Sequence, residues 1–305
     1  MLTPTPFVWF DGELVPWEQA TVHVLTHGLH YGSGVFEGIR VYATADGPAV
    51  FRLDDHMLRL ERSAKAFRIP LAWSAQQLSA AALDLVRANE LRSCYLRPIV
   101  FYGTGSIGLN PRGASVHAAM VAFEWGSYLG TAGMEVGVRI RVSSWRRVDH
   151  ETFIPNAKAT GQYLNSVLAK QEALAAGYDE ALMLNTAGFV AEGTGENLFL
   201  VRDGVVCTPP TSAGALDGLT RASVMRILAD EGHPVVEEQV SRSDLYYADE
   251  AFFTGTAAEV TPIREIDDRT VGTGMPGPIT RLAQERYLAA ARGEVPQYRS
   301  WLQFV

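Results

Sequence analysis

Residues 153–166 read FIPNAKATGQYLNS and set Lys158 between two alanines. The chain contains only three lysines, Lys65, Lys158 and Lys170, beside 23 arginines, so arginine fills nearly every position that merely needs a positive charge. Small, apolar neighbours disfavour the charged form of an amine and lower its pKa towards neutrality. Such an amine is a nucleophile that can form an imine with a carbonyl compound. We therefore expect Lys158 to be catalytic; the alternative is an ordinary lysine in solvent at a strand end.

The composition is typical of a soluble globular protein, with 305 residues of which 47% are hydrophobic and 20% charged. A net charge of −8 argues against nucleic acid or an anionic membrane as the main partner. No apolar run approaches the roughly 20 residues that span a bilayer, and the N-terminal residues lack a signal-peptide pattern. Cys94 and Cys207 form no metal or redox motif. These features predict a cytoplasmic protein.

Several local signals predict secondary structure. Asp11-Gly12 separates two short apolar segments and predicts a hairpin. We expect Asp54 and Asp55 to cap a first helix, and Ser74 with Gln77 to form the capping box of a second. Strands alternate with helices in groups along the chain, which indicates an α+β fold in two domains.

The domain prediction divides the chain at a flexible, glycine-rich segment. Residues 1–125 are expected to form a small N-terminal α+β domain, and residues 126–134 an interdomain loop. Residues 135–305 are then the larger C-terminal domain, which carries Lys158 and a helix from about Tyr163 to Ala176. Within the first domain, the glycines between residues 28 and 38 indicate a backbone that approaches another segment closely.

Three motifs invite a functional reading that we do not favour. His23, His27 and His30 lack further ligands nearby, so we expect structural histidines and no metal site. The basic cluster formed by Arg139, Arg141, Arg146 and Arg147 is interpreted as a solvated strand face.

GTGSIG, residues 103–108, fits the spacing of a dinucleotide fingerprint, which would make the protein a nicotinamide-dependent oxidoreductase. That motif also needs a helix to begin at its glycines, so that the helix N-terminus can hold the pyrophosphate. Pro111 and Gly113 follow and oppose such a helix. A loop between two strands is the better interpretation.

AEGTGEN, residues 191–197, places Glu192 and Glu196 between glycines at a strand end. A pyridine ring that acts as an electron sink needs a carboxylate beside its nitrogen. Residues 219–220 open a helix, whose free N–H groups favour an anion, and residues 255–257 form a tight turn after a strand. With Arg59, these segments complete one requirement: an imine lysine, an acid for a ring nitrogen and a phosphate site.

Together these pieces resemble the branched-chain amino acid aminotransferases, which are fold type IV pyridoxal-phosphate enzymes. The resemblance covers nearly the whole chain and rests on FVWFDGELVPWEQATVHVLTHGLHYGSGVFEGIR, HMLRLERSAK, YLRP, GLNP, WGSYLG, IPNAKATGQYL, EGTGENLF, LTR, LYYADEAFFTGTAAEVTP and GPIT. It implies a two-domain α+β fold like that of D-amino acid aminotransferase, with pyridoxal 5'-phosphate between the domains. Gln162 and Asp217 depart from the family's usual residues, which puts only local loop detail in doubt.

The resemblance also implies residue roles. Lys158 should hold the cofactor as an internal aldimine, Tyr163 should bond the phenolic oxygen of its ring, and Glu192 should pair with the pyridine nitrogen. The phosphate should be held by Arg59, Leu219, Thr220 and Thr256. The substrate pocket should comprise Phe36, Gly38, Tyr95, Arg97, Trp125, Tyr128 and Ala257, with Tyr31 and Leu109 reaching it from the other subunit of a dimer.

The implied reaction moves the amino group of L-leucine, L-isoleucine or L-valine to 2-oxoglutarate, with Lys158 as the general base. The pocket's aromatic residues suit the branched side chain, while Arg97 and the hydroxyls of Tyr31 and Tyr128 suit the γ-carboxylate. The expected partners are small amino acids and 2-oxo acids and a second copy of the chain, as a homodimer or a dimer-based assembly. D-amino acid aminotransferases, (R)-amine transaminases and aminodeoxychorismate lyases share the lysine and the cofactor site, so they remain alternatives.

Overall fold

The computed structural model describes residues 3–126 and 128–305, which fold into two compact units with both helices and sheets. Unit 1 comprises the chain up to Trp125 together with Ala157–Gly161 and Ala290–Val305. Unit 2 comprises Gly126–Asn156 and Gln162–Ala289. The α+β class predicted from the sequence is confirmed.

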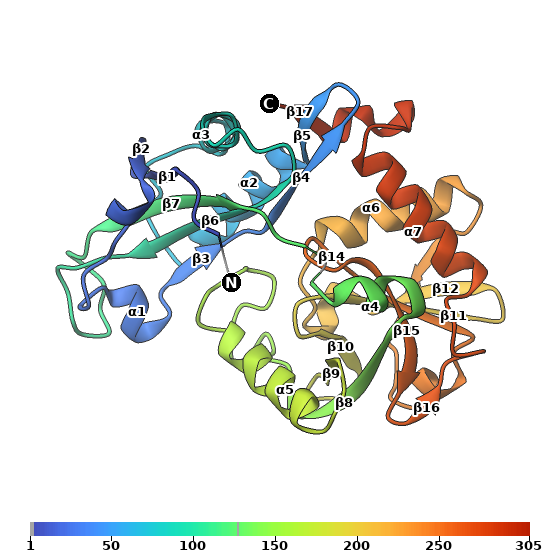
Figure 1. Cartoon of the computed structure of the whole chain (residues 1–305). Helices are drawn as coiled ribbons and strands as arrows, with labels where there is room; N and C mark the ends of the chain where they lie inside the picture. The colour runs from blue at the N-terminus through green and yellow to red at the C-terminus, as the bar shows by residue number, and fades with distance from the viewer. Residues whose placement is uncertain (1–2, 127) are drawn as a thin grey trace. The chain divides into compact units, whose positions relative to one another are not determined.

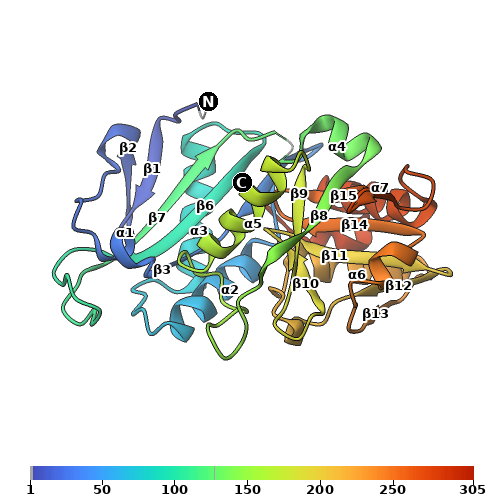
Figure 2. The same cartoon turned by 90° about the horizontal axis from the view of Figure 1, so that it is seen from below.

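Unit 1 contains an antiparallel sheet whose strands follow the order β17-β5-β4-β6-β7-β1-β2, with β3 also paired to β6 (Figures 1 and 2). The central pair, β6 and β7, runs in continuous register from Tyr95↔Phe123 to Tyr102↔Val116. The strands are β1 (Phe7–Phe10), β2 (Glu13–Pro16), β3 (Gly34–Phe36), β4 (Ile39–Thr44), β5 (Gly47–Phe51), β6 (Cys94–Tyr102), β7 (Val116–Phe123) and β17 (Leu302–Phe304).

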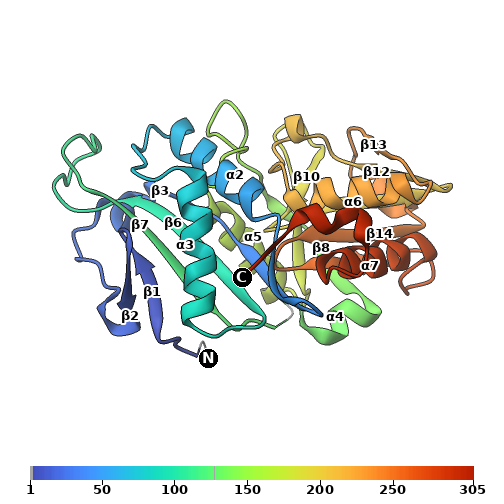
Figure 3. The same cartoon turned by 90° about the horizontal axis from the view of Figure 1, so that it is seen from above.

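Helices α2 (Leu53–Ala66) and α3 (Ala75–Ala88) lie over the same face of this sheet (Figures 1 and 3). Met57, Leu60 and Ala64 are buried along α2, as the helical spacing of apolar residues predicts. The remaining helical segments of the unit are α1 (His27–Tyr31), η1 (Trp17–Gln19) and η4 (Pro296–Trp301).

Most of the local signals in unit 1 predict the structure correctly. The Asp11-Gly12 hairpin is confirmed, with Phe10 opposite Glu13, and so is the reciprocal capping box of Ser74 and Gln77. The prediction that Asp54 and Asp55 cap the first helix is wrong. The N-cap residue is Arg52, which makes no side-chain cap bond, and both aspartates lie in the first helical turn. Their negative charge still suits the positive end of the helix dipole.

Unit 2 contains a mixed sheet with the order β10-β9-β8-β15-β14-β11-β12-β13, and β16 pairs with β15. The pairs β8–β9, β8–β15 and β12–β13 are parallel, and the others are antiparallel. The strands are β8 (Val138–Arg146), β9 (Glu180–Leu184), β10 (Val190–Gly193), β11 (Asn197–Arg202), β12 (Val205–Thr208), β13 (Val235–Glu237), β14 (Glu250–Gly255), β15 (Glu259–Ile266) and β16 (Arg269–Thr270).

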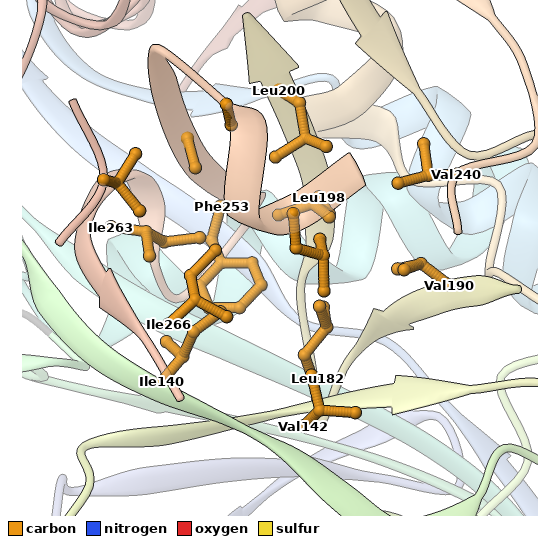
Figure 4. Packing of buried hydrophobic residues seen from close by; sticks show 14 of the residues in the cluster. Ile140, Val142, Leu182, Val190, Leu198, Leu200, Val240, Phe253, Ile263 and Ile266 are labelled. Atoms are coloured by element: carbon orange, nitrogen blue, oxygen red, sulfur yellow. The ribbon is translucent and has the colours of Figure 1, made fainter. Parts of the chain in front are cut away.

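One hydrophobic cluster fills the concave side of this sheet (Figure 4). Val190 on β10 and Cys207 on β12 belong to the same buried cluster, although their strands lie near opposite ends of the strand order. The sheet therefore curves around its core. Phe253, Leu198 and Leu182 contribute from the strands between them.

The helical segments of unit 2 are α4 (Gly130–Val136), α5 (Tyr163–Ala175), α6 (Leu219–Asp230), η2 (Thr211–Ala213) and η3 (Asp244–Tyr247), followed by α7 (Pro278–Ala291). Helix α5 packs on β8 and β9, where Ala169 and Ala173 contact Ala181 and Met183. The predicted end of this helix near Gly177 is confirmed by the positive φ of 82° at that glycine. Among the described residues, no helix is long and apolar enough to cross a bilayer.

Two features differ from the predicted domain boundaries. The expected loop 126–134 contains the start of helix α4 at Gly130; residue 127 of that loop lies outside the described residues. Residues 157–161 and 290–305, which were assigned to the C-terminal domain, pack in unit 1. Strand pairing explains both assignments, because β17 pairs with β5 and Ala159 forms a bridge with Val35.

The close approach predicted for the glycines between residues 28 and 38 occurs at Gly32. This residue has a φ of +60°, and a Cβ atom there would lie 2.6 Å from the Cα of Gly161. Such a contact is too short for any real Cβ, so neither backbone can accept a side chain without moving. Gly32 thus fixes how closely the segment that contains Lys158 approaches β3.

We predict that Gly32→Ala destabilises the protein clearly more than Gly204→Ala does. Gly204 has a φ of +77°, and a Cβ atom there would have nothing within 4 Å, so its substitution costs only the left-handed strain of about 1–2 kcal/mol. Gly32→Ala adds an overpacking cost of about 1–3 kcal/mol. Urea unfolding of both variants measures the difference. Equal losses of stability would show that the contact with Gly161 carries no energy.

Candidate functional site

Lys158 is held in unit 1 by its own main chain. Its N–H donates to Ser63 Oγ on α2 at 3.1 Å, and its carbonyl oxygen accepts from the N–H of Phe36 at 2.9 Å. The neighbouring alanines 157 and 159 are buried, and the Lys158 side chain is half-buried. Its Nζ lies 5.0 Å from the centre of the Phe36 ring. The segment fixes the base of the side chain and directs the amine along an aromatic wall.

Arg59, also on α2, is oriented by a buried carboxylate. Its Nε donates to Glu37 Oε1 at 2.6 Å, and its Nη2 donates to Glu37 Oε2 at 2.8 Å. The ring of His56 lies 2.7 Å from the same Oε2 through Nδ1. Glu37 is fully buried and His56 is 1% exposed. A two-point contact of this kind fixes both the position and the plane of the guanidinium.

The charges of this group explain how Glu37 tolerates burial. Burial alone would raise the pKa of its carboxyl, but the positive charge of Arg59 and the contact with His56 outweigh it and hold that pKa well below its usual range. Burial lowers the pKa of His56, against the opposing effect of Glu37. Arg59 and Glu37 therefore form an ionised pair beside a neutral imidazole at neutral pH.

The substrate residues predicted in unit 1 lie together. The guanidinium of Arg97 is stacked at 4.9 Å from the Phe36 ring and 5.3 Å from the Tyr95 ring. Trp125 meets Tyr95 edge to face at 4.7 Å. A Cβ atom on Gly38 would lie 1.8 Å from the Tyr95 hydroxyl, so this position has room for hydrogen only. Among the described residues, the buried Nε of Arg97 has no hydrogen-bond partner.

Tyr31 and Leu109 lie apart from this group in sequence and are exposed in the single chain, by 44% and 83% respectively. The Tyr31 hydroxyl donates to the carbonyl of Ile107 at 2.8 Å, which joins the two segments. His27 lies next to them, buried, and contacts Ser33 Oγ at 2.6 Å and the Gly108 carbonyl at 2.9 Å. The structural role expected for this histidine is confirmed.

In unit 2, Glu192 on β10 is buried and surrounded by donors. Its Oε1 lies 2.8 Å from Arg147 Nη2, and its Oε2 accepts from the Leu216 N–H at 2.9 Å and from Asn197 Nδ2 at 3.2 Å. Arg147 is itself only 2% exposed. Such a set keeps the carboxylate ionised and fixed in orientation, as an acid facing a ring nitrogen must be.

Arg147 is a residue whose role the sequence did not reveal. The expectation of a solvated strand face is wrong for it, because β8 ends at Arg146 and Arg147 lies beyond the alternation of the strand. Its guanidinium contacts Glu192 and also faces Ser166 Oγ at 3.5 Å and the Gly214 carbonyl at 3.4 Å. The available signal was the need of a buried Glu192 for a buried cation.

The predicted phosphate segments lie beside the Glu192 turn. Asn197, which donates to Glu192, packs so closely on Gly218 that a Cβ there would lie 2.0 Å from Asn197 Oδ1. Gly218 is the N-cap of α6 and carries no side-chain cap, so Leu219 and the buried Thr220 open the helix with N–H groups directed outward. A Cβ on Gly255, just before Thr256, would lie 3.3 Å from the Gly195 carbonyl. The turn at residues 192–197 thus gathers both anion-binding segments.

The other predicted residues of unit 2 also occupy ends of elements. Tyr163 is the first residue of α5, and Thr256 and Ala257 lie in the turn that joins β14 to β15. Gln162, a departure from the expected motif, is the buried N-cap of α5. Tyr128 lies with its ring 5.4 Å from Lys170 Nζ.

The GTGSIG segment forms a loop between β6 and β7, and no helix begins at its glycines. The preferred interpretation as a loop is confirmed. The geometry that a dinucleotide fingerprint requires, a helix N-terminus directly after the glycines, is not present in residues 103–115.

Comparison with known proteins agrees with this geometry. The model of the family "Amino-transferase class IV" matches residues 34–266. The branched-chain-amino-acid aminotransferase of Pseudomonas aeruginosa (strain PAO1) is 46% identical over 96% of this chain and 95% of the relative.

Two solved structures of a branched-chain amino acid aminotransferase, whose source organism is abbreviated T.th., are each 46% identical to this chain. The structure with pyridoxamine 5'-phosphate has a TM-score of 0.96 and covers 100% of this chain and 99% of that one. The structure complexed with N-(5'-phosphopyridoxyl)-L-glutamate has a TM-score of 0.94 and covers 98% of each chain.

We predict that Glu37→Gln lowers the free energy of unfolding at pH 7 by about 3 kcal/mol, because it leaves the buried Arg59 charge without its carboxylate. Glu61→Gln on the exposed face of α2 is the matched control and should change it by less than about 0.5 kcal/mol. Since the pKa of Glu37 is lowered by folding, its contribution is present above about pH 4.3 and is lost as the pH falls further.

Urea unfolding at pH 7 and pH 3 measures both effects. Glu37→Gln should lose less stability on acidification than the unsubstituted protein does. An unchanged stability at pH 7 would contradict the account of Arg59.

Proposed function

Because this chain belongs to the class IV aminotransferases and transaminates branched-chain amino acids with pyridoxal 5'-phosphate, we propose that Lys158 is the residue that carries the cofactor. The observation that carries this proposal is the fixed main chain of Lys158 between Ser63 and Phe36. The other lysines suit other tasks: Lys170 is paired with Glu180, and Lys65 is exposed on α2. An arginine could not replace Lys158, since it cannot form an imine.

The residues of the chain fit the chemical groups of this cofactor. Glu192, with its charge fixed by Arg147, suits the pyridine nitrogen, and Tyr163 suits the phenolic oxygen. The uncapped start of α6 at Leu219 and Thr220, the turn at Thr256, and Arg59 suit the phosphate. When bound, pyridoxal 5'-phosphate supplies an electron sink that stabilises negative charge on the substrate Cα.

The chain's own contribution is proton transfer and positioning. The Lys158 amine takes the proton from the substrate Cα and later returns it, as a general base and then a general acid. Glu192 keeps a proton on the ring nitrogen through its carboxylate. Glu37 holds Arg59 in one plane, so that the guanidinium meets the phosphate without reorganisation.

We infer that one pocket accepts both amino donor and acceptor. Phe36, Tyr95 and Trp125 offer apolar and aromatic surface to a branched side chain. The Arg97 guanidinium, stacked on two of these rings with an unpaired Nε, suits the γ-carboxylate of 2-oxoglutarate. The glutamate adduct bound by the T.th. relative supports this choice of acceptor.

We propose that a second copy of the chain completes the pocket. Tyr31 and Leu109 are exposed in the single chain, and near them a 340 Å³ hollow is lined mainly by apolar residues, including Val22, Leu29 and Phe101. Leaving such a surface in water is unfavourable, whereas a dimer would cover it. The proposed compartment is the cytoplasm, in keeping with two buried cysteines that are not joined to each other.

Lys158→Arg is predicted to abolish transamination while leaving the fold intact. The variant keeps a positive charge but lacks an amine that can be deprotonated, so kcat should fall by at least about 10³-fold. Glutamate formation from L-leucine and 2-oxoglutarate measures the loss, and Lys65→Arg is the matched control with unchanged activity. Normal turnover in the Lys158 variant would refute the proposed role.

A panel of amino donors separates this function from the related ones. L-Leucine, L-isoleucine and L-valine should each give glutamate from 2-oxoglutarate, whereas D-alanine should not. The physical reason is that the pocket binds one face of the substrate Cα towards Lys158. Turnover of D-alanine without turnover of the branched L-amino acids would replace the proposal with a D-amino acid aminotransferase.

A further inference from the structure

Three glutamates are buried around the turn that joins β10 to β11. Glu180, Glu192 and Glu196 are 0%, 6% and 3% exposed. Isolated carboxylates are costly to bury, so each needs a compensating cation, a set of donors or a proton. The three differ in what compensates them.

Glu192 and Glu180 each have a cation. Glu192 pairs with Arg147 at 2.8 Å, and Glu180 Oε2 pairs with Lys170 Nζ at 2.6 Å. The Oε1 of Glu180 also accepts from Thr194 Oγ1 and from the Ala181 N–H, each at 2.7 Å. In residues 3–126 and 128–305, no arginine or lysine forms an ion pair with Glu196; its Oε2 accepts only the Gly195 N–H, at 3.0 Å.

The surroundings of Glu196 therefore contain two cations for three carboxyl groups. Glu180 faces it from β9, Glu192 from β10, Lys170 from α5, and Tyr128 from the segment before α4. Burial, together with the negative charge of Glu180, raises the pKa of Glu196 to about 8, although Lys170 and the Gly195 N–H oppose this. A proton on Glu196 balances the charges of the cluster.

Tyr128 is joined to the same cluster. Its hydroxyl is hydrogen-bonded to Thr194, which in turn donates to Glu180. Burial raises the pKa of Tyr128 above its ordinary value, and the charges of Glu196 and Glu180 add to this rise. Tyr128 therefore stays a neutral hydroxyl, and any negative charge on Glu196 acts on whatever binds there.

We propose that Glu196 is a positioning residue that carries a proton at neutral pH and so keeps negative charge away from Tyr128, where the dicarboxylate acceptor binds. The location of the acceptor rests on the proposed function; the proton on Glu196 does not. When Glu196 ionises in alkaline solution, its charge repels the second carboxylate of 2-oxoglutarate. A branched-chain donor has an uncharged side chain and is repelled less.

Infrared spectroscopy tests the proton directly. At pH 7 ordinary carboxyl groups are ionised, so the purified holoenzyme should show the carbonyl stretch of a protonated carboxylic acid, and this band should vanish by pH 10. Glu196→Gln should lack the titrating band, whereas Glu61→Gln should retain it. A holoenzyme without the band at pH 7 would overturn the proposal, and this test holds even if the enzyme uses other substrates.

Steady-state kinetics test the consequence. Between pH 7 and pH 9, the KM for 2-oxoglutarate should rise on the order of threefold or more beyond any rise in the KM for L-leucine. In Glu196→Gln, which keeps an acceptor for the Gly195 N–H but cannot ionise, this selective rise should disappear. A selective rise that persists in Glu196→Gln, or its absence in the unsubstituted enzyme despite the band, would overturn the role in acceptor binding. Absence of any turnover with L-leucine would instead refute the proposed function.

Discussion

The main-chain hydrogen bonds between residues 158–161 and β3 are the constraint on which the rest of the site depends. Lys158 O accepts from Phe36 N, and the N–H groups of Thr160 and Gly161 donate to the carbonyls of Gly34 and Gly32. A strand can approach another backbone this closely only where glycines leave the space. The hydrogen bonds therefore place the lysine and the aromatic wall at one edge of the unit 1 sheet, next to the helix that carries Arg59.

Electrostatics then divides the work among buried carboxylates. Glu37 is held ionised by Arg59 and serves to orient that arginine. Glu192 is held ionised by Arg147 and is available for a ring nitrogen, whereas Glu196 lacks such a cation among the described residues. The same residue type thus has different charge states at different positions, because its partners differ.

The sequence predicted the features that depend on local signals. The hairpin at Asp11-Gly12, the capping box at Ser74 and the helix start at Leu219 each follow from a few neighbouring residues. Partners brought in from distant segments were not predicted. Glu37 meets Arg59 through tertiary packing, and Arg147 was misread because strand alternation no longer applies beyond the end of β8. Residues 157–161 were placed in the wrong unit for the same reason, since their pairing with β3 is long-range.

The most direct test of the central claim is the location of the cofactor on the chain. Reduction of the holoenzyme with borohydride makes an imine between lysine and pyridoxal 5'-phosphate permanent, and peptide mass spectrometry then identifies the modified residue. With only three lysines in the chain, the result is unambiguous. We predict the phosphopyridoxyl group on Lys158 alone. A modified Lys65 or Lys170 with Lys158 unmodified would contradict the account.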